Sequence, residues 1–170
     1  MRKKLFFWEL GDFLFTGLAG CLLHFTYEWS GGWAWPFSAV NESTWEHMKL
    51  LFFPMFLYTA AQVWALGKTY PNLLAVRVVS TLAGLALIPT LFYTYTGVWG
   101  QMRDWANIAV FFAAALAAFL LDWRLLRRGA LAEKWQQVAG LAVLWALAFC
   151  FVWCTTHPPA LALWRDPTKG

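Results

Sequence analysis

Charged residues are scarce in this sequence. Asp, Glu, Lys and Arg make up 13% of its 170 residues, whereas soluble domains carry about 25%. Hydrophobic residues make up 61%, and the mean hydropathy is +0.52. This composition excludes an ordinary soluble domain and predicts an integral membrane protein whose main partner is the lipid bilayer. The formal net charge of +4 is small and lies near the ends of hydrophobic runs, which argues against nucleic acid as a partner.

Several patterns that would indicate a specific chemistry are also missing. The three cysteines form no C-x-x-C pair, which argues against a thiol–disulfide oxidoreductase. The histidines form no H-E-x-x-H metal motif, and they lie near the ends of hydrophobic runs, too shallow for an enclosed haem. No internal repeat or low-complexity linker divides the chain. The sequence therefore indicates an architecture and one polar region, but no particular reaction.

Long hydrophobic runs predict an all-α fold, with a single transmembrane helical domain over residues 1–170. Each run is near or above the roughly 20 residues that cross a bilayer. The first run follows the basic residues 2–4 and shows no cleavage pattern, so we expect a retained helix rather than a signal peptide. Pro54 and Pro89 predict kinks, and an Ala-rich run at 113–118 predicts a fourth helix buried among the others. The five predicted helices cover approximately residues 5–28, 44–66, 72–98, 104–123 and 134–155.

Basic residues predict the orientation of this bundle of about five helices. Five crossings place the two ends of the chain on opposite faces, and Lys and Arg concentrate on the cytoplasmic face. Most Lys and Arg residues fall on the side of the N-terminus. The sequence therefore predicts a cytoplasmic N-terminus, with the C-terminus and the stretch 40–49 facing outside.

The densest polar stretch of the chain runs from Val40 to Lys49. His24 and Glu28 are four residues apart, so they share a face of the first helix, and a short connection makes the first two helices antiparallel neighbours. We therefore expect an outward-facing pocket rich in His, Glu and Trp. Imidazoles beside carboxylates suit a metal site, with His24 and His47 as ligands and zinc or copper as the ion. The predicted binding residues are His24, Glu28, Asn41, Glu42, Glu46, His47 and Lys49.

Helix capping explains part of the same stretch. Residues 43–46 match the capping box S-x-x-E, in which Ser43 covers a backbone donor of the helix and Glu46 reaches back to the N-cap. Asn41 and Glu42 are then ordinary residues at the start of a helix. Capping alone, and capping combined with a functional pocket, both remain open.

The cysteines allow a second metal site. Cys21 precedes His24 by three residues, and Cys154 precedes His157 by three. Such C-x-x-H pairs suit a soft metal ion such as copper. Free cysteines are more often small buried residues at helix contacts, which is the structural alternative.

Three ionisable residues lie inside the predicted helices on the N-terminal side. Glu9 and Asp12 of the first helix lie at a depth comparable to Arg77 of the third. Ionisable residues inside a span are costly and are usually paired or functional. We predict an Asp12–Arg77 ion pair. A proton or ion pathway is the alternative, although few titratable residues separate this layer from the histidines.

Part of the sequence resembles a known family. The stretch His24 to Gly31, followed by Val40 to Lys49 and by Phe53-Pro54, gives the pattern H…Y-x-W-S-G…V-N-E-S-x-W-E-H-x-K…P. This pattern is similar to that of an uncharacterised family of small bacterial multi-pass membrane proteins. The resemblance is close over the first third of the chain and rests on hydropathy beyond it. It implies a location in the bacterial cytoplasmic (inner) membrane and no assigned activity, cofactor or site.

Three classes of function fit these observations. The first is binding or transport of a small solute or ion by the outward-facing pocket. The second is a membrane-embedded metal-dependent hydrolase that acts on a lipid-like substrate, with Glu28 or Glu46 as the base. The third is a structural or accessory membrane subunit. The sequence does not predict the oligomeric state.

Overall fold

The computed structural model describes residues 2–169, and over that range it consists of helices and connecting loops without a strand. Each of the five α-helices is long and apolar enough to cross a membrane. The chain is therefore an all-helical, multi-pass membrane protein, as its composition predicts. The elements are α1 (Arg2–Trp29), α2 (Thr44–Leu66), α3 (Leu73–Trp99), α4 (Asp104–Arg128), α5 (Lys134–Thr156) and the short 3₁₀ helix η1 (Ala162–Trp164).

The largest difference from the predicted helix boundaries lies at the end of α4. The prediction stopped at residue 123 because the hydrophobic run ends there. Arg and Leu are good helix formers, so the helix continues to Arg128. Gly129 then adopts a φ of 65°, and its N–H bonds to the carbonyl of Leu126. This left-handed glycine ends the helix.

α2 lies at the centre of the bundle and packs against α1, α3, α5 and η1. Its side chains Leu51 and Phe52 join Ala118 of α4 in the main hydrophobic cluster. α4 buries only one face, and Leu116 and Leu120 on its other side are exposed. The prediction that α4 is buried among the other helices is therefore wrong for that side, which suits contact with lipid.

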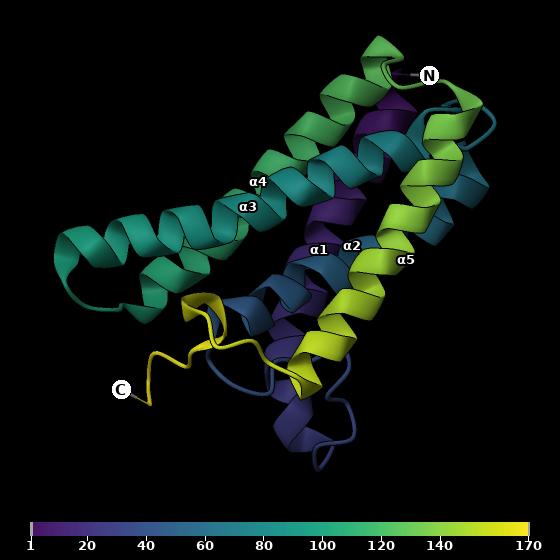
Figure 1. Ribbon diagram of the computed structural model, residues 1–170. Coiled ribbons are helices and arrows are strands. Elements are labelled where there is room, and N and C mark those ends of the chain that lie inside the picture. Colours follow the sequence, from purple (N-terminus) through teal and green to yellow (C-terminus); the bar gives the residue numbers. More distant parts are fainter. Residues whose placement is uncertain (1, 170) are drawn as a thin grey trace.

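The α3–α4 hairpin crosses the rest of the bundle obliquely. Figure 1 shows α1, α2 and α5 running between the two ends of the molecule, with the tip of the hairpin directed away from α5. The two helices of the hairpin approach closely at Gly84, where an added Cβ would lie 3.2 Å from the Cβ of Ala118. Residues at the start of α4 and in the C-terminal half of α1 line a common cleft.

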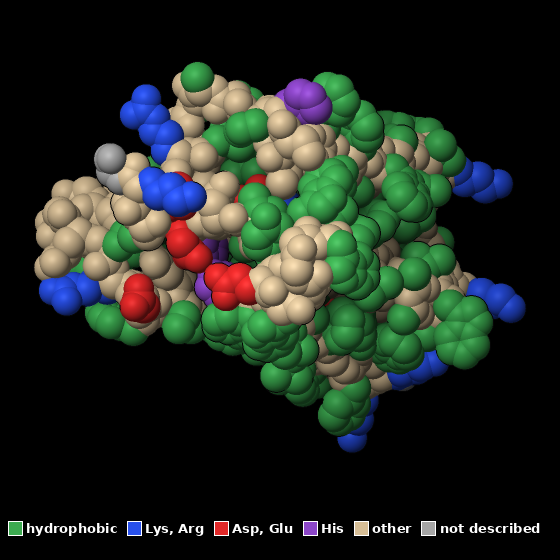
Figure 2. Space-filling view, turned by 90° about the horizontal axis from the view of Figure 1, so that it is seen from below, with side chains coloured by type: hydrophobic (Ala, Val, Ile, Leu, Met, Phe, Trp, Pro, Cys, Tyr) green, Lys and Arg blue, Asp and Glu red, His purple; other side chains and the backbone are tan. Residues whose placement is uncertain are grey.

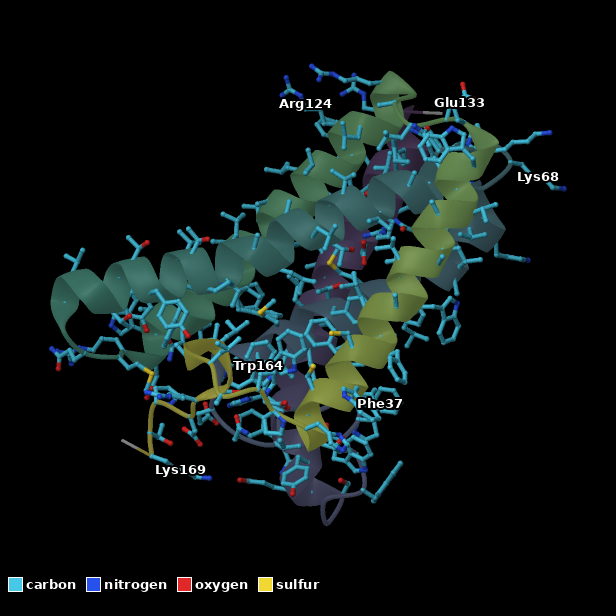
Figure 3. The ribbon with its side chains drawn as sticks, in the orientation of Figure 1. Phe37, Lys68, Arg124, Glu133, Trp164 and Lys169 are labelled. Carbon is cyan, nitrogen blue, oxygen red and sulfur yellow. The ribbon has the colours of Figure 1, made fainter. Side chains whose placement is uncertain are left out.

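The two ends of the molecule differ in their polar groups. Residues 30–43 and 157–169 lie at the same end, which we call the loop end (Figure 1). Figure 3 places Trp164 and Lys169 at the loop end and Lys68 and Arg124 at the opposite end. Acidic and histidine side chains gather on the loop end, beside a largely hydrophobic surface (Figure 2).

Candidate functional site

The loop between α1 and α2 presents Glu42 directly before the first turn of α2. Ser43 is the N-cap of α2, and its Oγ accepts a hydrogen bond from the backbone N–H of Glu46 at 3.4 Å. The backbone N–H of Ser43 donates to Oδ1 of Asn41 at 2.9 Å, which forms an Asx-type turn. Asn41 and Ser43 therefore fix the backbone on both sides of Glu42.

The side chain of Glu46 does not complete the capping box that the sequence predicts. Its carboxylate instead accepts a hydrogen bond from the N–H of Val40 at 3.1 Å and pairs with Nζ of Lys49 at 2.7 Å. Lys49 Nζ also donates to the carbonyl of Trp35 and to Oγ1 of Thr155, both at 3.0 Å. Glu46 and Lys49 are buried. This buried network ties the α1–α2 loop and α2 to α5.

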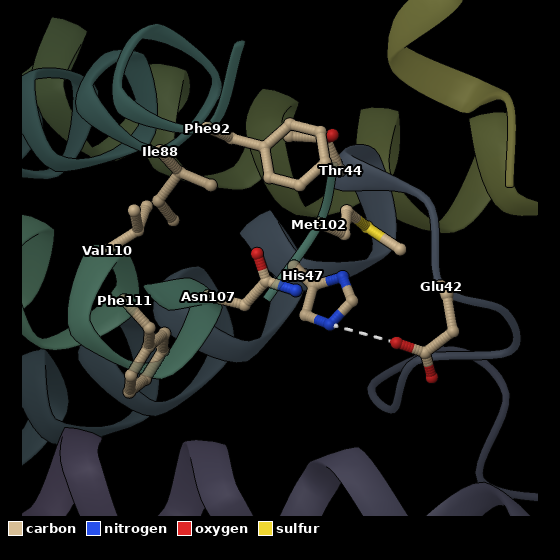
Figure 4. A pocket seen from close by; sticks show the side chains of 9 residues that line it. All are labelled: Glu42, Thr44, His47, Ile88, Phe92, Met102, Asn107, Val110 and Phe111. Atoms are coloured by element: carbon tan, nitrogen blue, oxygen red, sulfur yellow. Dashed lines mark ion pairs between the residues drawn. The ribbon is translucent and has the colours of Figure 1, made fainter. Parts of the chain in front are cut away.

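His24 of α1, Glu42 of the loop and His47 of α2 come together in what we call the His–Glu–His cluster. Nε2 of His24 lies 3.9 Å from Oε1 of Glu42. Nε2 of His47 lies 3.4 Å from Oε2 of the same carboxylate (Figure 4). The two imidazole centroids are 5.4 Å apart. One potential ligand atom from each residue lies within 4.8 Å of the others.

Hydrogen bonding orients the ring of His47. Its Nδ1 lies 3.0 Å from the carbonyl oxygen of Ser43, which can only accept, so Nδ1 carries the proton. In the neutral ring this leaves the lone pair on Nε2, which points toward Glu42. A metal-binding histidine is typically held in this way, with the other ring nitrogen donating to a carbonyl or carboxylate. Nδ1 of His24 is buried without a hydrogen-bond partner among the described residues.

The spacing of the cluster is close to that of a tetrahedral zinc site. With ligand bonds of about 2.0–2.2 Å, two ligands of such an ion lie about 3.3–3.6 Å apart. The separation of 3.4 Å between Nε2 of His47 and Oε2 of Glu42 falls in this range. Nε2 of His24 lies 3.9 Å from the other oxygen of Glu42, Oε1, so the side chains would have to move closer together to bind one ion. Three protein ligands leave a fourth position for water or a bound molecule. Without an ion, the same atoms form two His–Glu pairs.

An apolar cleft lies beside the cluster, between α1 and α4. It has a volume of about 270 Å³, and His24, Glu42 and His47 line it. Asp104 and Asn107, at the start of α4, add polar atoms to a wall that is otherwise largely hydrophobic. The cluster therefore borders a space that suits an apolar chain. The remaining lining residues are Gly20, Cys21, Phe25, Leu50, Ile108, Phe111 and Phe112.

A smaller cavity lies on the other side of His47, toward α3. Glu42, His47 and Asn107 line both this cavity and the cleft. Figure 4 shows Ile88 and Phe92 of α3 closing the cavity above the imidazole of His47. His47 therefore lines both spaces, together with Glu42, Asn107 and Phe111.

The other predicted site residues lie outside the cluster. Glu28 is exposed in the last turn of α1 and lines neither cavity. α1 extends beyond the start of α2 (Figure 1), so this turn has no neighbouring helix to face. Asn41 shapes the loop, and Glu46 and Lys49 bind each other. Of the seven predicted residues, His24, Glu42 and His47 remain as those able to share one ligand.

Over residues 2–169, neither His157 nor a cysteine belongs to the group of potential ligands formed by His24, Glu42 and His47. His157 is exposed and stacks on Trp153, with ring centroids 4.2 Å apart. Cys150 and Cys154 contact each other, with sulfur atoms 3.9 Å apart. Cys21 lines the cleft beside His24. Among the described residues, His157 belongs to no group of neighbouring metal-ligand side chains.

A second polar cluster lies inside the bundle. Nη1 of Arg77 donates to Oδ2 of Asp12 at 2.5 Å, so the ion pair predicted from the sequence is present. Nη2 of Arg77 lies 3.0 Å from Oδ2 of Asp122 on α4. All three side chains are buried. The sequence does not predict the contact of Asp122, because spacing along the chain does not show which helices cross at this depth.

Comparison with known proteins identifies the family and no function. No curated protein and no solved structure matches this chain. A model of a family of unknown function, DUF6512, matches residues 3–170. The prediction of an uncharacterised family is thereby confirmed. Since the match extends over almost the whole sequence, the chain belongs to the DUF6512 family.

Proposed function

We propose that this protein is a bacterial inner-membrane protein that binds a zinc-type divalent metal ion at its outward-facing end. His24, Glu42 and His47 would be the ligands. The observation that supports the proposal most strongly is that three side chains from separate segments converge at distances suited to a tetrahedral ion. Two imidazoles and one carboxylate favour Zn²⁺ over Mg²⁺ and Ca²⁺, because those ions prefer oxygen ligands.

The support around His47 strengthens the proposal. The carbonyl of Ser43 holds the ring in the tautomer that leaves Nε2 free for a metal ion. Asn41 and Ser43 fix the loop that carries Glu42. A ligand set held in this way loses less conformational freedom when the ion binds.

The proposed orientation follows the distribution of basic residues. The end opposite the loop end carries Lys68 and Arg124 (Figure 3), and Arg127 and Arg128 follow in the last turn of α4. Basic residues favour the cytoplasmic side of a membrane. The metal site then faces outside. A cysteine introduced at Lys169 should react with a membrane-impermeant maleimide added to intact cells in which the native cysteines are replaced. Reaction only after cell lysis would contradict this orientation.

A second candidate function is metal-assisted hydrolysis of a lipid-like substrate. The apolar cleft supports it, because an acyl chain could lie between α1 and α4 with its polar head beside the ion. An ion with three protein ligands can carry a water molecule and lower its pKa. Glu28 and Glu46 suit the role of base poorly, since one is exposed outside the cleft and the other is paired with Lys49. Asp104 lines the cleft and is the better candidate.

Metal content tests the proposal of a metal site. The full chain would be purified in detergent without chelators, supplied with zinc, copper or no metal, dialysed and subjected to elemental analysis. We expect one zinc ion per chain in the wild type. We expect the affinity for zinc to fall by at least about tenfold in His24→Gln, Glu42→Gln and His47→Gln.

Two substitutions serve as matched controls. His157→Gln removes the exposed histidine outside the cluster, and Glu28→Gln removes the exposed carboxylate one turn beyond His24. Both variants should bind zinc as the wild type does. A wild-type protein that retains neither zinc nor copper, or an equal loss in the controls and the cluster variants, would overturn the proposal in favour of a structural role.

A further inference from the structure

The polar cluster around Arg77 draws on four membrane-spanning helices. Glu9 and Asp12 come from α1, Gln62 from α2, Arg77 from α3 and Asp122 from α4, and all five side chains are buried. One carboxylate oxygen from each of the three acids lies within 4.8 Å of the others. The groups therefore form one electrostatic unit inside the bundle, separate from the His–Glu–His cluster.

The charges in this unit do not balance. Three carboxylates share one guanidinium, so the fully ionised cluster carries two uncompensated negative charges. An unpaired charge in a low-dielectric interior is costly, and a group placed there commonly becomes neutral instead. Tyr58 of α2 is a further titratable side chain near these groups, and its hydroxyl lies against Gly11 of α1. α5 contributes no group to the hydrogen bonds that the structure describes around Arg77.

The guanidinium reaches two of the three acids. Arg77 donates to Asp12 and lies 3.0 Å from Asp122. Its Nη2 also donates to Oε1 of Gln62. This contact fixes the amide of Gln62, whose Nε2 then donates to Oε1 of Glu9 at 2.9 Å. Glu9 is thus attached to the cation only through a neutral amide.

One oxygen of Glu9 has no donor. Its Oε2 is fully buried and has no hydrogen-bond partner among residues 2–169. Asp122 accepts a hydrogen bond from Oγ of Ser80 through Oδ1 at 2.9 Å, but its Oδ2 receives none beyond the ion-pair contact with Arg77. Among the described residues, Oε2 of Glu9 thus faces no donor, whereas Oδ2 of the neighbouring Asp122 has only its ion-pair contact with Arg77. A proton on Glu9 would supply that donor and remove one of the uncompensated charges.

We propose that Glu9 and Asp122 form a buried proton-binding site that holds one proton between their carboxyl groups in the folded protein at neutral pH. Glu9 is the protonated acid and Asp122 the acceptor. Asp12 and Asp122 then face Arg77 as the ionised partners. Glu9 lies seven residues after Arg2, which is about 10 Å along the helix, so the proton exchanges with the side of the membrane where α1 begins.

Infrared spectroscopy of the full chain in lipid nanodiscs tests the proposal. The wild type at neutral pH should show the carbonyl stretch of a protonated carboxylic acid, which shifts when H₂O is replaced by D₂O. The band should disappear in Glu9→Gln and persist in Glu28→Gln, which removes an exposed acid. Absence of the band in folded wild type, or a band of unchanged intensity in Glu9→Gln, would overturn the proposal.

A stability measurement provides an independent readout. The folded wild type should bind one proton that the unfolded chain releases above mildly acidic pH, so its stability should fall as the pH rises through neutrality. Glu9→Gln keeps a neutral side chain at every pH, so its stability should depend less on pH. If sodium chloride stabilised the wild type more than choline chloride at equal concentration, and the carboxylic acid band were missing, the occupant would be a sodium ion rather than a proton.

Discussion

His47 and Glu42 face each other across the start of α2, with 3.4 Å between Nε2 of the imidazole and Oε2 of the carboxylate. The contact is short enough for both groups to bind one ion. The orientation of the imidazole is fixed by a hydrogen bond on its other side, between Nδ1 and the backbone carbonyl of Ser43. Because His24 lies near the same carboxylate, the three side chains can be tested together for metal binding.

Zinc binding should depend on pH. A metal ion binds only the deprotonated form of an imidazole, and imidazoles take up protons between about pH 8 and pH 5. We expect the affinity for zinc to decrease as the pH falls through that range, with protons released on binding. Isothermal titration calorimetry in buffers of different ionisation enthalpy measures both effects. An affinity independent of pH in this range would argue against histidine ligands.

Removal of the carboxylate of Asp104 should separate catalysis from metal binding. If the site hydrolyses an amphiphilic ester, Asp104→Asn should lower kcat by roughly 10²–10⁴-fold, the usual contribution of a general base, and should leave the zinc content unchanged. Turnover of a fluorogenic ester of a long-chain fatty acid by the zinc-loaded protein measures this. Loss of zinc together with activity would instead place Asp104 among the metal ligands.

The buried pair of Glu46 and Lys49 should be more important for stability than for metal binding. Their side chains are 3% and 0% exposed, so Lys49→Met leaves a buried carboxylate without its cation and should cost about 3–5 kcal/mol. Adding Glu46→Gln should restore much of the loss. Reversible unfolding in mixed detergent micelles measures the three variants. Equal stability of the single and double variants would show that the two charges are not coupled.

Close contact between α1 and α2 should depend on Gly20. An added Cβ at this position would lie 2.8 Å from the backbone oxygen of Leu50 and 2.6 Å from Cζ of Phe111, so Gly20→Ala should destabilise the fold by about 1–3 kcal/mol. The matched control is Gly97→Ala, because a Cβ added at Gly97 would meet no other atom within 4 Å. Alanine is more favourable than glycine inside a helix by about 0.5–1 kcal/mol. Opposite signs in the same unfolding assay are expected. If both variants lost stability equally, packing at Gly20 would not be the cause.

Sequence patterns predicted the helices well because lipid imposes length and composition on each span. The bounds of α2 match the prediction, whereas α4 runs further because its charged last turns have no hydrophobic signal. The ion pair of Asp12 and Arg77 could be predicted because both residues lie at a similar depth in their helices. The contact of Arg77 with Asp122 could not be predicted, because it depends on how α4 crosses α3.

The sequence predicts where the candidate site lies, but not which of its side chains come together. His24 and His47 were expected together because α1 and α2 are antiparallel neighbours. Glu42 could not be separated from Glu28 and Glu46 by spacing. Its place depends on the backbone of the loop, where Asn41 bonds to the N–H of Ser43 and leaves Glu46 to pair with Lys49. Which of these local hydrogen bonds form depends on the backbone conformation of the folded loop, and the sequence pattern does not show it.

X-ray absorption at the zinc edge of the zinc-loaded wild-type protein tests the central claim most directly. The proposed site predicts only nitrogen and oxygen ligands at about 2.0–2.2 Å, with multiple-scattering features from two imidazoles. In His47→Gln the signal of one imidazole should be lost. A sulfur ligand at about 2.3 Å, or a zinc ion without imidazole scattering, would contradict a metal centre formed by His24, Glu42 and His47.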